Sequence, residues 1–533
     1  MITFTENTGY ATDFGMRLFP DRVALIQEDL ELSYGALDER SNQIANGLLD
    51  RGVRKGDAVF LLYDNDVRFV EAILGVMRIG AVAVPANNKQ SDERIVDMVS
   101  DSGSKVLLAG PSFAAKVAEL RPRLACESVF AIGAEDEGED LNAWMAASSS
   151  ARPQVSVTGD DLCMLPYTSG STGRPKGVMI RHRNWLWNTD LMRRVMMLRP
   201  DDRALCANPL FHANALSLGI FPSLLAGGSA VVLPRFDPTD VVRAIEKWGC
   251  TFMTGVPTMY RMLVDQPGLK PSGTRSMRFL ICGSAPMTKG LLADLDAAFP
   301  GVTLVEGYGL TEGGPSISFL PRFGARRMGS VGLPMPEVEV KLLDSSGQEV
   351  DVDTPGELWT RNPGVAAGYH GLPAETSERF RDGWLRTGDM LRRDSDGYLY
   401  YCGRADERMN VAGEHAFPAE VEAVLLQHPQ IRDVVVTSCP HALKNEVPVA
   451  HVVPAAGAVL DPKEVRDFFC ARAPRYAQPR GLILWDALPV SPTGKTDRAT
   501  LSRAAAEAFD FGRVPQTGSS VGADILDVRT NVR

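Results

Sequence analysis

The chain has 533 residues, more than a single hydrophobic core usually serves, so its length predicts two or more domains. The apolar fraction of 44% and the charged fraction of 23% are typical of a soluble globular protein. A net charge of -10 and the lack of long Lys/Arg runs argue against a nucleic-acid partner.

Short apolar runs alternate with helical patterns from about residue 20 to residue 320. The runs are apolar throughout rather than at every second residue, which predicts strands covered on both faces of a sheet. Helical spacing at 68–78 and 240–248 predicts two of the intervening helices. The alternation as a whole predicts an α/β architecture with doubly wound sheets. The predicted strands are 58–63, 81–85, 106–108, 230–233, 251–254 and 279–282.

Residues 167–180 form a loop with the sequence YTSGSTGRPKGVMI. Glycine and proline interrupt helices and strands, whereas the backbone N–H groups, hydroxyls and Lys176 of this loop can wrap the phosphates of a nucleotide. The spacing is not that of a P-loop, because Pro175 precedes the lysine and Gly177, rather than Ser or Thr, follows it. A surface linker is the alternative, and the apolar residues on both sides of the loop argue against it.

Beyond about residue 330 the pattern changes. Apolar runs at 338–343, 356–360 and 398–401 predict short antiparallel strands joined by Gly/Asp turns. A new unit follows, in which two helical patterns alternate with two apolar runs, as expected for a small α+β domain. Its predicted elements are 418–427, 434–436, 447–453 and 462–471.

These changes predict the domain organisation. A large N-terminal domain, 1–404, contains the doubly wound sheets and ends in a β-rich subdomain. A small α+β domain, 405–508, follows it. The last segment, 509–533, is polar and rich in Gly, Ser and Asp, which predicts a flexible tail.

Further motifs follow predicted strands, where open α/β sheets bind ligands. Residues 307–312 (GYGLTE) supply an aromatic face, a hydroxyl and a carboxylate that suits Mg²⁺. Residues 283–286 (GSAP) follow another strand, and a plain turn is the alternative for both motifs. Asp389 can accept hydrogen bonds from two vicinal hydroxyls, and Arg404 ends the same hairpin. As isolated residues, these two would be ordinary surface charges.

The cysteines and histidines form no pattern typical of a metal or redox centre. The eight cysteines have no C-x-x-C spacing, and the seven histidines include no H-E-x-x-H motif, so we expect buried thiols in a reducing compartment and no structural zinc. The start of the chain lacks a basic region followed by an apolar stretch, and no run of about eighteen apolar residues occurs. These features favour a cytoplasmic enzyme without a signal peptide or a transmembrane segment.

Together and in this order, the motifs resemble those of the adenylate-forming (ANL) superfamily, which includes acyl-CoA synthetases, peptide-synthetase adenylation domains and beetle luciferases. The resemblance covers about residues 10–505 and is closest to the acyl- and aryl-CoA synthetase branch. It implies that ATP and AMP bind to Thr168, Ser169, Gly170, Ser171, Thr172, Gly173, Lys176, Gly283, Ser284, Ala285, Pro286, Gly307, Tyr308, Gly309, Thr311, Asp389 and Arg404.

The resemblance also implies individual roles. Thr311 would contact the α-phosphate, and Glu312 would hold Mg²⁺. Lys495, in the loop 491–495 (SPTGK), would bridge the two reacting anions, because a carboxylate and a phosphate repel each other. His212, in the motif PLFH, would gate the entry of the carboxylate. Asp406 would be the hinge about which a mobile C-terminal domain rotates.

The implied reaction has two steps. A carboxylic acid attacks ATP to give acyl-AMP and pyrophosphate, and the thiol of CoA then displaces AMP. Gly413 and Glu414 match the Gly-Glu pair that lies beside the pantetheine path of CoA ligases, whereas Asn410 stands where many relatives have lysine. Residues 208–217 (NPLFHANALS) contain no aspartate to bind an amino group, and Ala213, Ala215 and Leu216 suggest an apolar lining. The segment therefore favours a carboxylic acid that carries no amino group as the substrate.

Three alternatives stay open. The enzyme could load the phosphopantetheine thiol of a carrier protein, or it could be an oxidative enzyme of the luciferase type. A catalytically silent protein that binds acyl-adenylate is the third. The sequence identifies neither the acid, whether aryl or of short, medium or long chain, nor the oligomeric state.

Overall fold

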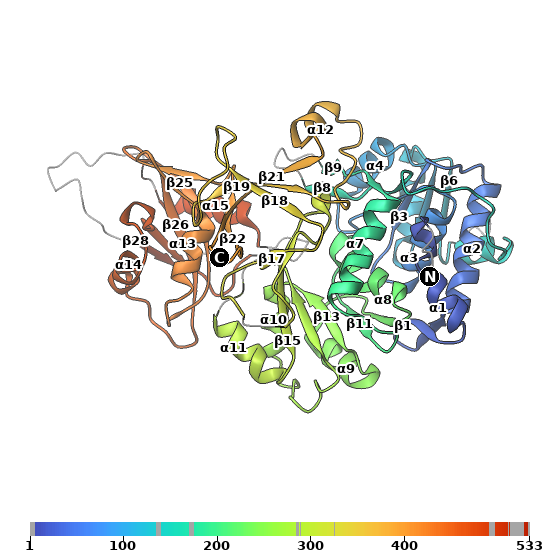
Figure 1. Cartoon of the computed structure of the whole chain (residues 1–533), viewed down its shortest axis with the longest axis horizontal. Helices are drawn as coiled ribbons and strands as arrows, with labels where there is room; N and C mark the ends of the chain where they lie inside the picture. The colour runs from blue at the N-terminus through green and yellow to red at the C-terminus, as the bar shows by residue number, and fades with distance from the viewer. Residues whose placement is uncertain are drawn as a thin grey trace.

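The computed structural model describes residues 6–134, 140–169, 175–283, 287, 289–323, 326–489, 496–509 and 511, and the backbone alone of 527–530. The side chains of Ser169, Lys289 and His415 are outside this description. A six-stranded sheet lies at one end of the long axis and the C-terminal domain at the other, with a nine-stranded and a five-stranded sheet between them (Figure 1). The expected fold class is confirmed.

The six-stranded sheet has the order β10-β7-β4-β3-β5-β6, and all of its strands are parallel except β10. Three predicted strands, 58–63, 81–85 and 106–108, correspond to β3, β4 and β5. The strands are β3 Ala58–Leu62, β4 Val82–Pro85, β5 Val106–Ala109, β6 Ser128–Ala131, β7 Leu162–Met164 and β10 Ile180–Arg181. The accompanying helices are α2 Tyr34–Asp50, α3 Val67–Arg78, α4 Asp92–Asp101, α5 Ala114–Leu120 and α6 Leu141–Ala146.

The nine-stranded sheet has the order β17-β16-β15-β14-β13-β11-β12-β1-β2. Its central strands, from β15 to β1, are parallel, while the pairs β1–β2, β15–β16 and β16–β17 are antiparallel. The strands are β1 Val23–Gln27, β2 Leu30–Ser33, β11 Arg203–Cys206, β12 Ser229–Val232, β13 Phe252–Gly255, β14 Phe279–Cys282, β15 Thr303–Tyr308, β16 Ser318–Phe319 and β17 Leu333–Pro334. The helices are α1 Asp13–Leu18, α7 His182–Val195, α8 Phe221–Leu225, α9 Pro238–Trp248, α10 Pro257–Val264 and α11 Lys289–Ala298.

Successive residues of the central strands belong to different parts of the core. In β3, Val59 packs in the large cluster that joins the two sheets, whereas Phe60 packs with residues of α4 and α5. In β13, Phe252 belongs to the same large cluster, and Met253 packs with residues of α9, α10 and α11. Each sheet is therefore covered on both faces, which explains why these strands are apolar at every position.

Helix α9 shows how local signals set the ends of these elements. The side chain of Asp237 accepts hydrogen bonds from the backbone N–H groups of Thr239 and Asp240, and Pro238 is the first helical residue. Gly249 ends the helix in the left-handed conformation, with φ of 60°. The helix therefore starts two residues before the predicted 240–248 and ends where predicted.

The C-terminal third contains two antiparallel-rich sheets. The five-stranded sheet consists of β18 Glu339–Leu343, β19 Gly356–Arg361, β20 Phe380–Arg381, β21 Trp384–Arg393 and β22 Leu399–Arg404, with α12 Pro373–Arg379 beside it. The C-terminal domain consists of β23 Met409–Val411, β24 Glu414–Ala416, β25 Ile431–His441, β26 Asn445–Pro454, β27 Gly481–Leu484, α13 Pro418–Leu425, α14 Pro462–Cys470 and α15 Arg498–Ala508. Helix α13 packs on β22.

One strand lies where the sequence predicted only a flexible tail, over 509–533. The backbone of β28, Asp527–Thr530, pairs in parallel with β27 and extends the C-terminal sheet. A sheet edge offers unpaired N–H and C=O groups, and the β-branched residues Val528 and Thr530 favour an extended chain. The prediction of a loose tail is therefore corrected for these four residues.

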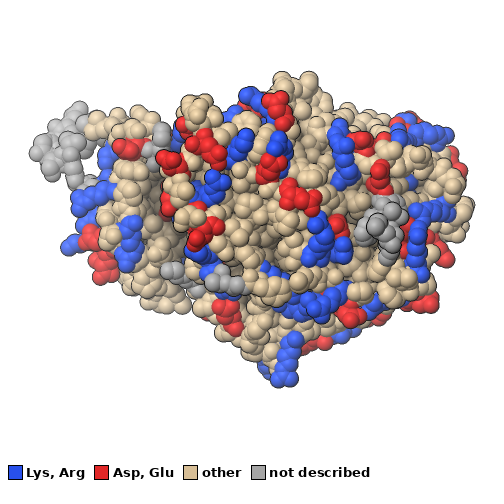
Figure 2. Space-filling view, in the orientation of Figure 1, with Lys and Arg blue, Asp and Glu red and all other residues tan. Residues whose placement is uncertain are grey.

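The distribution of charged side chains and the burial of the cysteines agree with what the composition predicts. On the face shown in Figure 2, Lys and Arg side chains alternate with Asp and Glu side chains among the described residues. All eight cysteines are free, and seven of them are buried. Over the described residues, no helix combines the length and the apolar character needed to cross a bilayer.

Candidate functional site

The glycine-rich loop begins and ends as a β-hairpin. Strand β8, Tyr167–Ser169, pairs with β9, Pro175–Gly177, and places Thr168 opposite Lys176. Two residues predicted to bind phosphate are thus neighbours across the hairpin. The other predicted residues of this loop, Gly170, Ser171, Thr172 and Gly173, lie outside the described residues.

A segment nearly two hundred residues away in sequence holds this hairpin in place. The N–H of His370 donates to the carbonyl of Gly177, and the N–H of Met179 donates to the carbonyl of Gly368. On the other side, the hydroxyl of Tyr167 donates to Asp101 Oδ2 over 2.5 Å at the end of α4. Two separate parts of the chain, residues 368–370 and the end of α4, therefore fix the position of the hairpin.

Tyr369 connects two of the predicted site residues. Its hydroxyl donates a hydrogen bond of 3.0 Å to Glu312 Oε1, and its ring lies 5.4 Å from Lys176 Nζ. Burial raises the pKa of Tyr369, and the charge of Glu312 raises it further, so the hydroxyl stays protonated and remains a donor. Glu312 and Thr311 belong to a single turn of 3-10 helix, Thr311–Gly313.

Sequence reasoning missed Tyr369. In the sequence, Tyr369 is only an aromatic residue next to Gly368, in a region without a predicted helix or strand. Such residues are common, so nothing local marks Tyr369 as part of the site. Its place becomes evident once the isolated bridge between Val178 and Tyr369 joins this segment to the end of the hairpin. The cation of the loop and the carboxylate predicted to hold Mg²⁺ thus contact the same phenol ring.

Tyr308, Asp389 and Arg404, which were predicted from two separate motifs, lie together. The hydroxyl of Tyr308 donates to Asp389 Oδ2 over 2.5 Å, and Arg404 Nη1 donates to Asp389 Oδ1 over 2.9 Å. Burial raises the pKa of Tyr308 and the charge of Asp389 raises it further. Burial lowers the pKa of Arg404, but the attraction of Asp389 outweighs it and the net shift is upward. The carboxylate of Asp389 therefore lies between two hydrogen-bond donors.

The strand pairing explains this geometry. Asp389 on β21 lies directly opposite Arg404 on β22. Gly388 has φ of 75°, and a Cβ at this position would lie 3.2 Å from Arg404 Nη2. The hydroxyl of Thr387 donates to the carbonyl of Leu358 and accepts from the N–H of Asp389. The Thr-Gly-Asp sequence therefore fixes the carboxylate and leaves room for the guanidinium.

The remaining glycines of the two strand-end motifs lie close to other main-chain atoms. A Cβ on Gly283 would lie 3.5 Å from the carbonyl oxygen of Gly307, and a Cβ on Gly309 would lie 2.1 Å from that of Pro315. A side chain at Gly309 would therefore clash with the main chain of Pro315, whereas the distance at Gly283 is an ordinary contact. Ser284, Ala285 and Pro286 of the same prediction lie outside the described residues.

His212 lies in the loop after β11. Its ring centroid is 4.5 Å from that of Phe211, and it is half-buried. A π-helix, Ala215–Ile220, begins directly afterwards, and π-helical turns occur often at functional sites. At its start, Asn214 Oδ1 accepts hydrogen bonds from Asn208 and Thr254. The predicted apolar residues here, Ala213, Ala215 and Leu216, are buried in the large core cluster.

The predicted hinge and thiol-path residues lie at the start of the C-terminal domain. Asp406 is exposed and lies 3.5 Å from Arg404 Nε. Gly413, with φ of 93°, donates its N–H to Asn410 Oδ1 in the turn between β23 and β24. Asn410, the departure from the expected lysine, thus stabilises that turn. Lys495 lies outside the described residues.

Glu414 borders a cavity of about 600 Å³ between the C-terminal domain and the five-stranded sheet. Pro355 and Met390 line it from the sheet, and Tyr476 lines it from the C-terminal domain. The turn with Gly413 and Glu414 therefore borders a cavity to which the hairpin 167–177 contributes no described residue.

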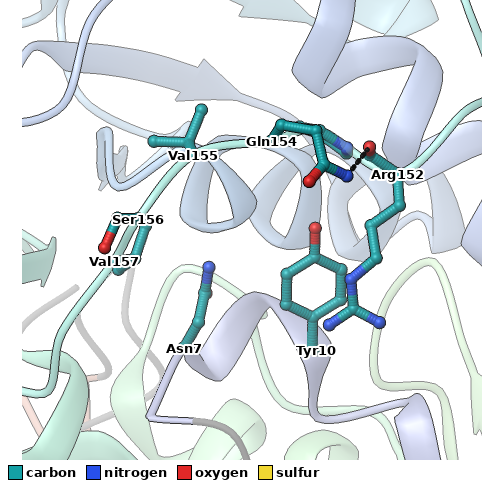
Figure 3. A pocket seen from close by; sticks show the side chains of 8 residues that line it. Asn7, Tyr10, Arg152, Gln154, Val155, Ser156 and Val157 are labelled. Atoms are coloured by element: carbon teal, nitrogen blue, oxygen red, sulfur yellow. Dashed lines mark hydrogen bonds between the residues drawn. The ribbon is translucent and has the colours of Figure 1, made fainter.

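A second cavity, of about 470 Å³, lies near the start of the chain (Figure 3). It lies between the 3-10 helix Thr8–Tyr10 and residues 152–157, and the side-chain amide of Gln154 donates to the carbonyl of Arg152 there. The guanidinium of Arg152 lies 3.6 Å from the centroid of the Tyr10 ring and 3.2 Å from Asp13 Oδ2. These contacts hold the first helices onto the domain, and none of the predicted site residues lines this cavity.

The site residues suit a nucleotide with a divalent cation. Mg²⁺ is usually held by one or two carboxylates together with phosphate oxygens, and Glu312 offers one such carboxylate beside the phosphate-loop hairpin. Within the described ranges, no group of three or more His, Cys, Asp or Glu side chains could hold a metal by itself. Asp389 accepts two hydrogen bonds and, with two carboxylate oxygens, has acceptor capacity left for vicinal hydroxyls.

Comparison with known protein families places both parts of the chain. Residues 15–370 match the family described as AMP-binding enzyme. Residues 420–495 match the family described as AMP-binding enzyme C-terminal domain.

Two curated relatives are similar over most of their length. Feruloyl-CoA synthase of Amycolatopsis sp is 36% identical over 490 residues, which cover 91% of this chain and 96% of that protein. 4-Coumarate–CoA ligase 5 of Oryza sativa subsp. japonica is 33% identical over 482 residues, which cover 88% of this chain and 89% of that protein.

Solved structures agree. The anthranilate CoA ligase AuaEII in complex with anthranoyl-AMP has a TM-score of 0.86 and 26% identity, over 94% of this chain and 98% of that chain. ATP-bound MatB from Rhodopseudomonas palustris has a TM-score of 0.86 and 28% identity, over 95% of this chain and 100% of that chain.

Proposed function

Because this chain belongs to the AMP-binding enzyme family and is similar to acid–CoA ligases along most of its length, we infer that it is an AMP-forming acid–CoA ligase. Its reaction uses ATP, a carboxylic acid and CoA. An oxygen of the acid attacks the α-phosphorus of ATP, and the bond to pyrophosphate breaks. The thiolate of CoA then attacks the acyl carbon, and AMP leaves with the bonding electron pair.

One observation carries the assignment of the site. One connected group consists of Lys176, Tyr369 and Glu312, and a second consists of Tyr308, Asp389 and Arg404. The two groups meet on one motif, because Tyr308 and Glu312 are only four positions apart in the chain. We assign phosphate binding to the first group and ribose binding to the second. Tyr308 of the ribose group and Glu312 of the phosphate group are close in the motif, as the ribose and the phosphates are adjacent in ATP.

The residues divide the work of adenylation. Lys176 and the hairpin hold the phosphates, and Asp389 with Arg404 holds the ribose. Glu312 would hold Mg²⁺, which when bound neutralises charge on the phosphates. Thr311 contacts the α-phosphate. These contacts place the phosphorus for in-line attack and stabilise the charge that develops during it.

Three further residues complete the proposal. His212 gates the entry of the carboxylate. Lys495 bridges the carboxylate and the α-phosphate during adenylation. The C-terminal domain then rotates about Asp406, so that the turn with Gly413 and Glu414 comes to border the thiol path. Glu414 borders a cavity that no described residue of the hairpin lines, which supports such a rotation, because the turn would have to move to reach the acyl group.

We propose an aromatic acid with a short unsaturated side chain, of the 4-coumaric or ferulic type, as the substrate. Relatives named for these acids support the proposal, as does the apolar character of Ala213, Ala215 and Leu216. We further propose that the protein works in the cytoplasm, where ATP and CoA are present. Its eight free thiols support a reducing compartment.

The test measures the two half-reactions separately. Exchange of labelled pyrophosphate into ATP, measured with ferulic, 4-coumaric, anthranilic, indoleacetic, oxalic and fatty acids, reports adenylation. We expect the largest kcat/KM with the first two. If no acid gives pyrophosphate exchange above background, the proposed adenylation activity is contradicted. A preference for a fatty acid or oxalate would contradict the proposed class of substrate.

Release of AMP in the presence of CoA, compared with acylation of a phosphopantetheine-bearing carrier protein, reports the acceptor. We expect AMP and an acyl-CoA product with free CoA. Acylation of the carrier protein without turnover of CoA would instead favour the carrier-loading enzyme.

A further inference from the structure

Glu306 is a buried carboxyl group with no part in the reaction described above. It lies on β15 opposite Cys282 of β14, directly before Gly307 of the nucleotide-binding motif. Only 7% of its surface is exposed. A buried carboxylate is costly unless a cation or several hydrogen-bond donors stabilise it, so its contacts indicate its charge state.

The carboxyl group has one contact where a carboxylate needs several. The backbone N–H of Met287 donates a hydrogen bond to it. Over the residues that the structure describes, its Oε2 atom has no hydrogen-bond partner. Met287 is itself buried in the same apolar cluster as Cys282 and Leu304. The carboxyl group thus joins the end of β15 to Met287, which directly follows the motif 283–286.

The charges around Glu306 do not neutralise it. Arg326 acts on it electrostatically, but this guanidinium is partly exposed and already pairs with Asp296 at 3.2 Å. The neighbouring thiol of Cys282 is neutral, because burial raises its pKa. Burial likewise raises the pKa of Glu306 to about 7, against the smaller, opposing effects of Met287 and Arg326. The group therefore exchanges its proton near neutral pH.

Glu306 also lies beside the place assigned to the nucleotide. The main chains of Gly283 and Gly307 approach each other one residue away from it, and Tyr308, the residue after Gly307, bonds Asp389. An anion bound here favours the neutral form of a nearby carboxyl group. By thermodynamic linkage, the neutral form must then bind the anion more tightly than the charged form.

We propose that Glu306 is a proton-linked positioning residue, which takes up a proton when ATP binds and in its neutral form keeps Met287 bonded to the end of β15. The carbonyl oxygen of the protonated acid still accepts from the Met287 N–H. At higher pH the group is a carboxylate that no cation among the described residues neutralises. Its hydration then disturbs the end of β15, where Gly307 lies. The inference rests on the proposed nucleotide site and adds a regulation of that site by pH.

Calorimetry of ATP binding tests the proposal without any turnover. ATP with Mg²⁺ is titrated at about pH 7 into the wild-type enzyme and Glu306→Gln in two buffers that differ in ionisation enthalpy. Glutamine keeps the shape and the acceptor for Met287 but cannot titrate. We expect the wild type to take up a larger fraction of a proton than the variant. Between about pH 6 and about pH 8 the Kd of the wild type should rise severalfold more than that of the variant.

Glu339→Gln is the matched control, because Glu339 is an exposed carboxylate that pairs with Arg361 far along the five-stranded sheet. It should take up as many protons as the wild type. Equal proton uptake by the wild type and Glu306→Gln, or equal pH dependence of Kd, would overturn the inference even if pyrophosphate exchange is normal. ATP binding with the expected proton count but without exchange would instead contradict the proposed reaction.

Discussion

The hydroxyl of Tyr308 lies 2.5 Å from Asp389 Oδ2, although 81 positions separate the two residues in the chain. Tyr308 ends β15 of the nine-stranded sheet, and Asp389 lies in β21 of the five-stranded sheet. The bond therefore joins the two sheets at the proposed ribose site. Asp389 is buried and Tyr308 is half-buried, so a broken contact would leave a donor and an acceptor with little water to replace it.

Substitution of Asp389 should weaken ATP binding more than substitution of Tyr308. Asp389→Asn removes a charged acceptor shared with Arg404, and hydrogen bonds to charged groups contribute about 1.5–3 kcal/mol, so the KM for ATP should rise about 10- to 100-fold. Tyr308→Phe keeps the ring and leaves Asp389 bonded to Arg404, so the acceptor for the ribose remains and KM should rise only about threefold. Steady-state kinetics at saturating acid measure both. Asp353→Asn, which alters an exposed Arg392 partner, is the control and should match the wild type.

Tyr369→Phe should raise the Mg²⁺ concentration required for half-maximal pyrophosphate exchange. The variant loses the donor that orients Glu312 but keeps the ring beneath Lys176, so an increase of about three- to tenfold is expected. Tyr400→Phe is a close control, because its hydroxyl donates to Asp394 on the surface, 3.1 Å away. Identical Mg²⁺ dependence in the two variants would show that Tyr369 does not position Glu312.

Lys495→Ala should separate binding from chemistry. The side chain is proposed to bridge two anions in the transition state only, so kcat for adenylation should fall by about a thousandfold while Kd for ATP changes little. Thioester formation from supplied acyl-AMP and CoA should continue, since that step does not use the lysine. Lys463→Ala, at the start of α14, removes an exposed lysine and should leave both steps unchanged. An unchanged adenylation rate in the first variant would remove Lys495 from the mechanism.

Glu306→Gln should stabilise the enzyme at alkaline pH and have little effect at acid pH. The pKa of Glu306 is raised from 4.5 to about 7 by burial, so the folded state binds a proton more tightly than the unfolded state. Stability is therefore lost as pH rises from about 4.5 to about 7, by about 3 kcal/mol as an upper limit for this group. Urea unfolding of the wild type and the variant at about pH 5 and about pH 8 measures the difference. A gap of equal size at both pH values would contradict the assigned ionisation.

Much of the fold could be predicted because its strands are apolar at every position. β3, β13 and β14 belong to sheets covered on both faces, and such runs can be recognised without knowledge of their partners. Asp389 and Arg404 could be selected for a similar reason. The hairpin that brings them together is local, with a Gly/Asp turn between its strands.

Other parts of the site depend on contacts that local sequence does not reveal. Tyr369 matters because residues 366–370 pair with the far end of a hairpin almost two hundred positions earlier. Glu306 continues an apolar run, and its contact with the backbone of Met287, in a segment about twenty positions earlier, is not evident from local sequence. β28 could not be foreseen because four ordinary residues became a strand only where β27 offered an edge.

Arg404 lies between two aspartates, with Asp389 Oδ1 at 2.9 Å in the large domain and Asp406 Oδ1 at 3.5 Å at the proposed pivot. The N–H of Ala405, between Arg404 and Asp406, donates to the carbonyl of Gly388 and anchors the connection to the strand that bears Asp389. A rotation of the small domain about Asp406, as proposed above, would therefore change the electrostatic environment of this guanidinium at the proposed ribose site. In the proposed reaction, binding of the nucleotide and the angle between the domains would then be coupled through Arg404, which contacts an aspartate on each side of the pivot.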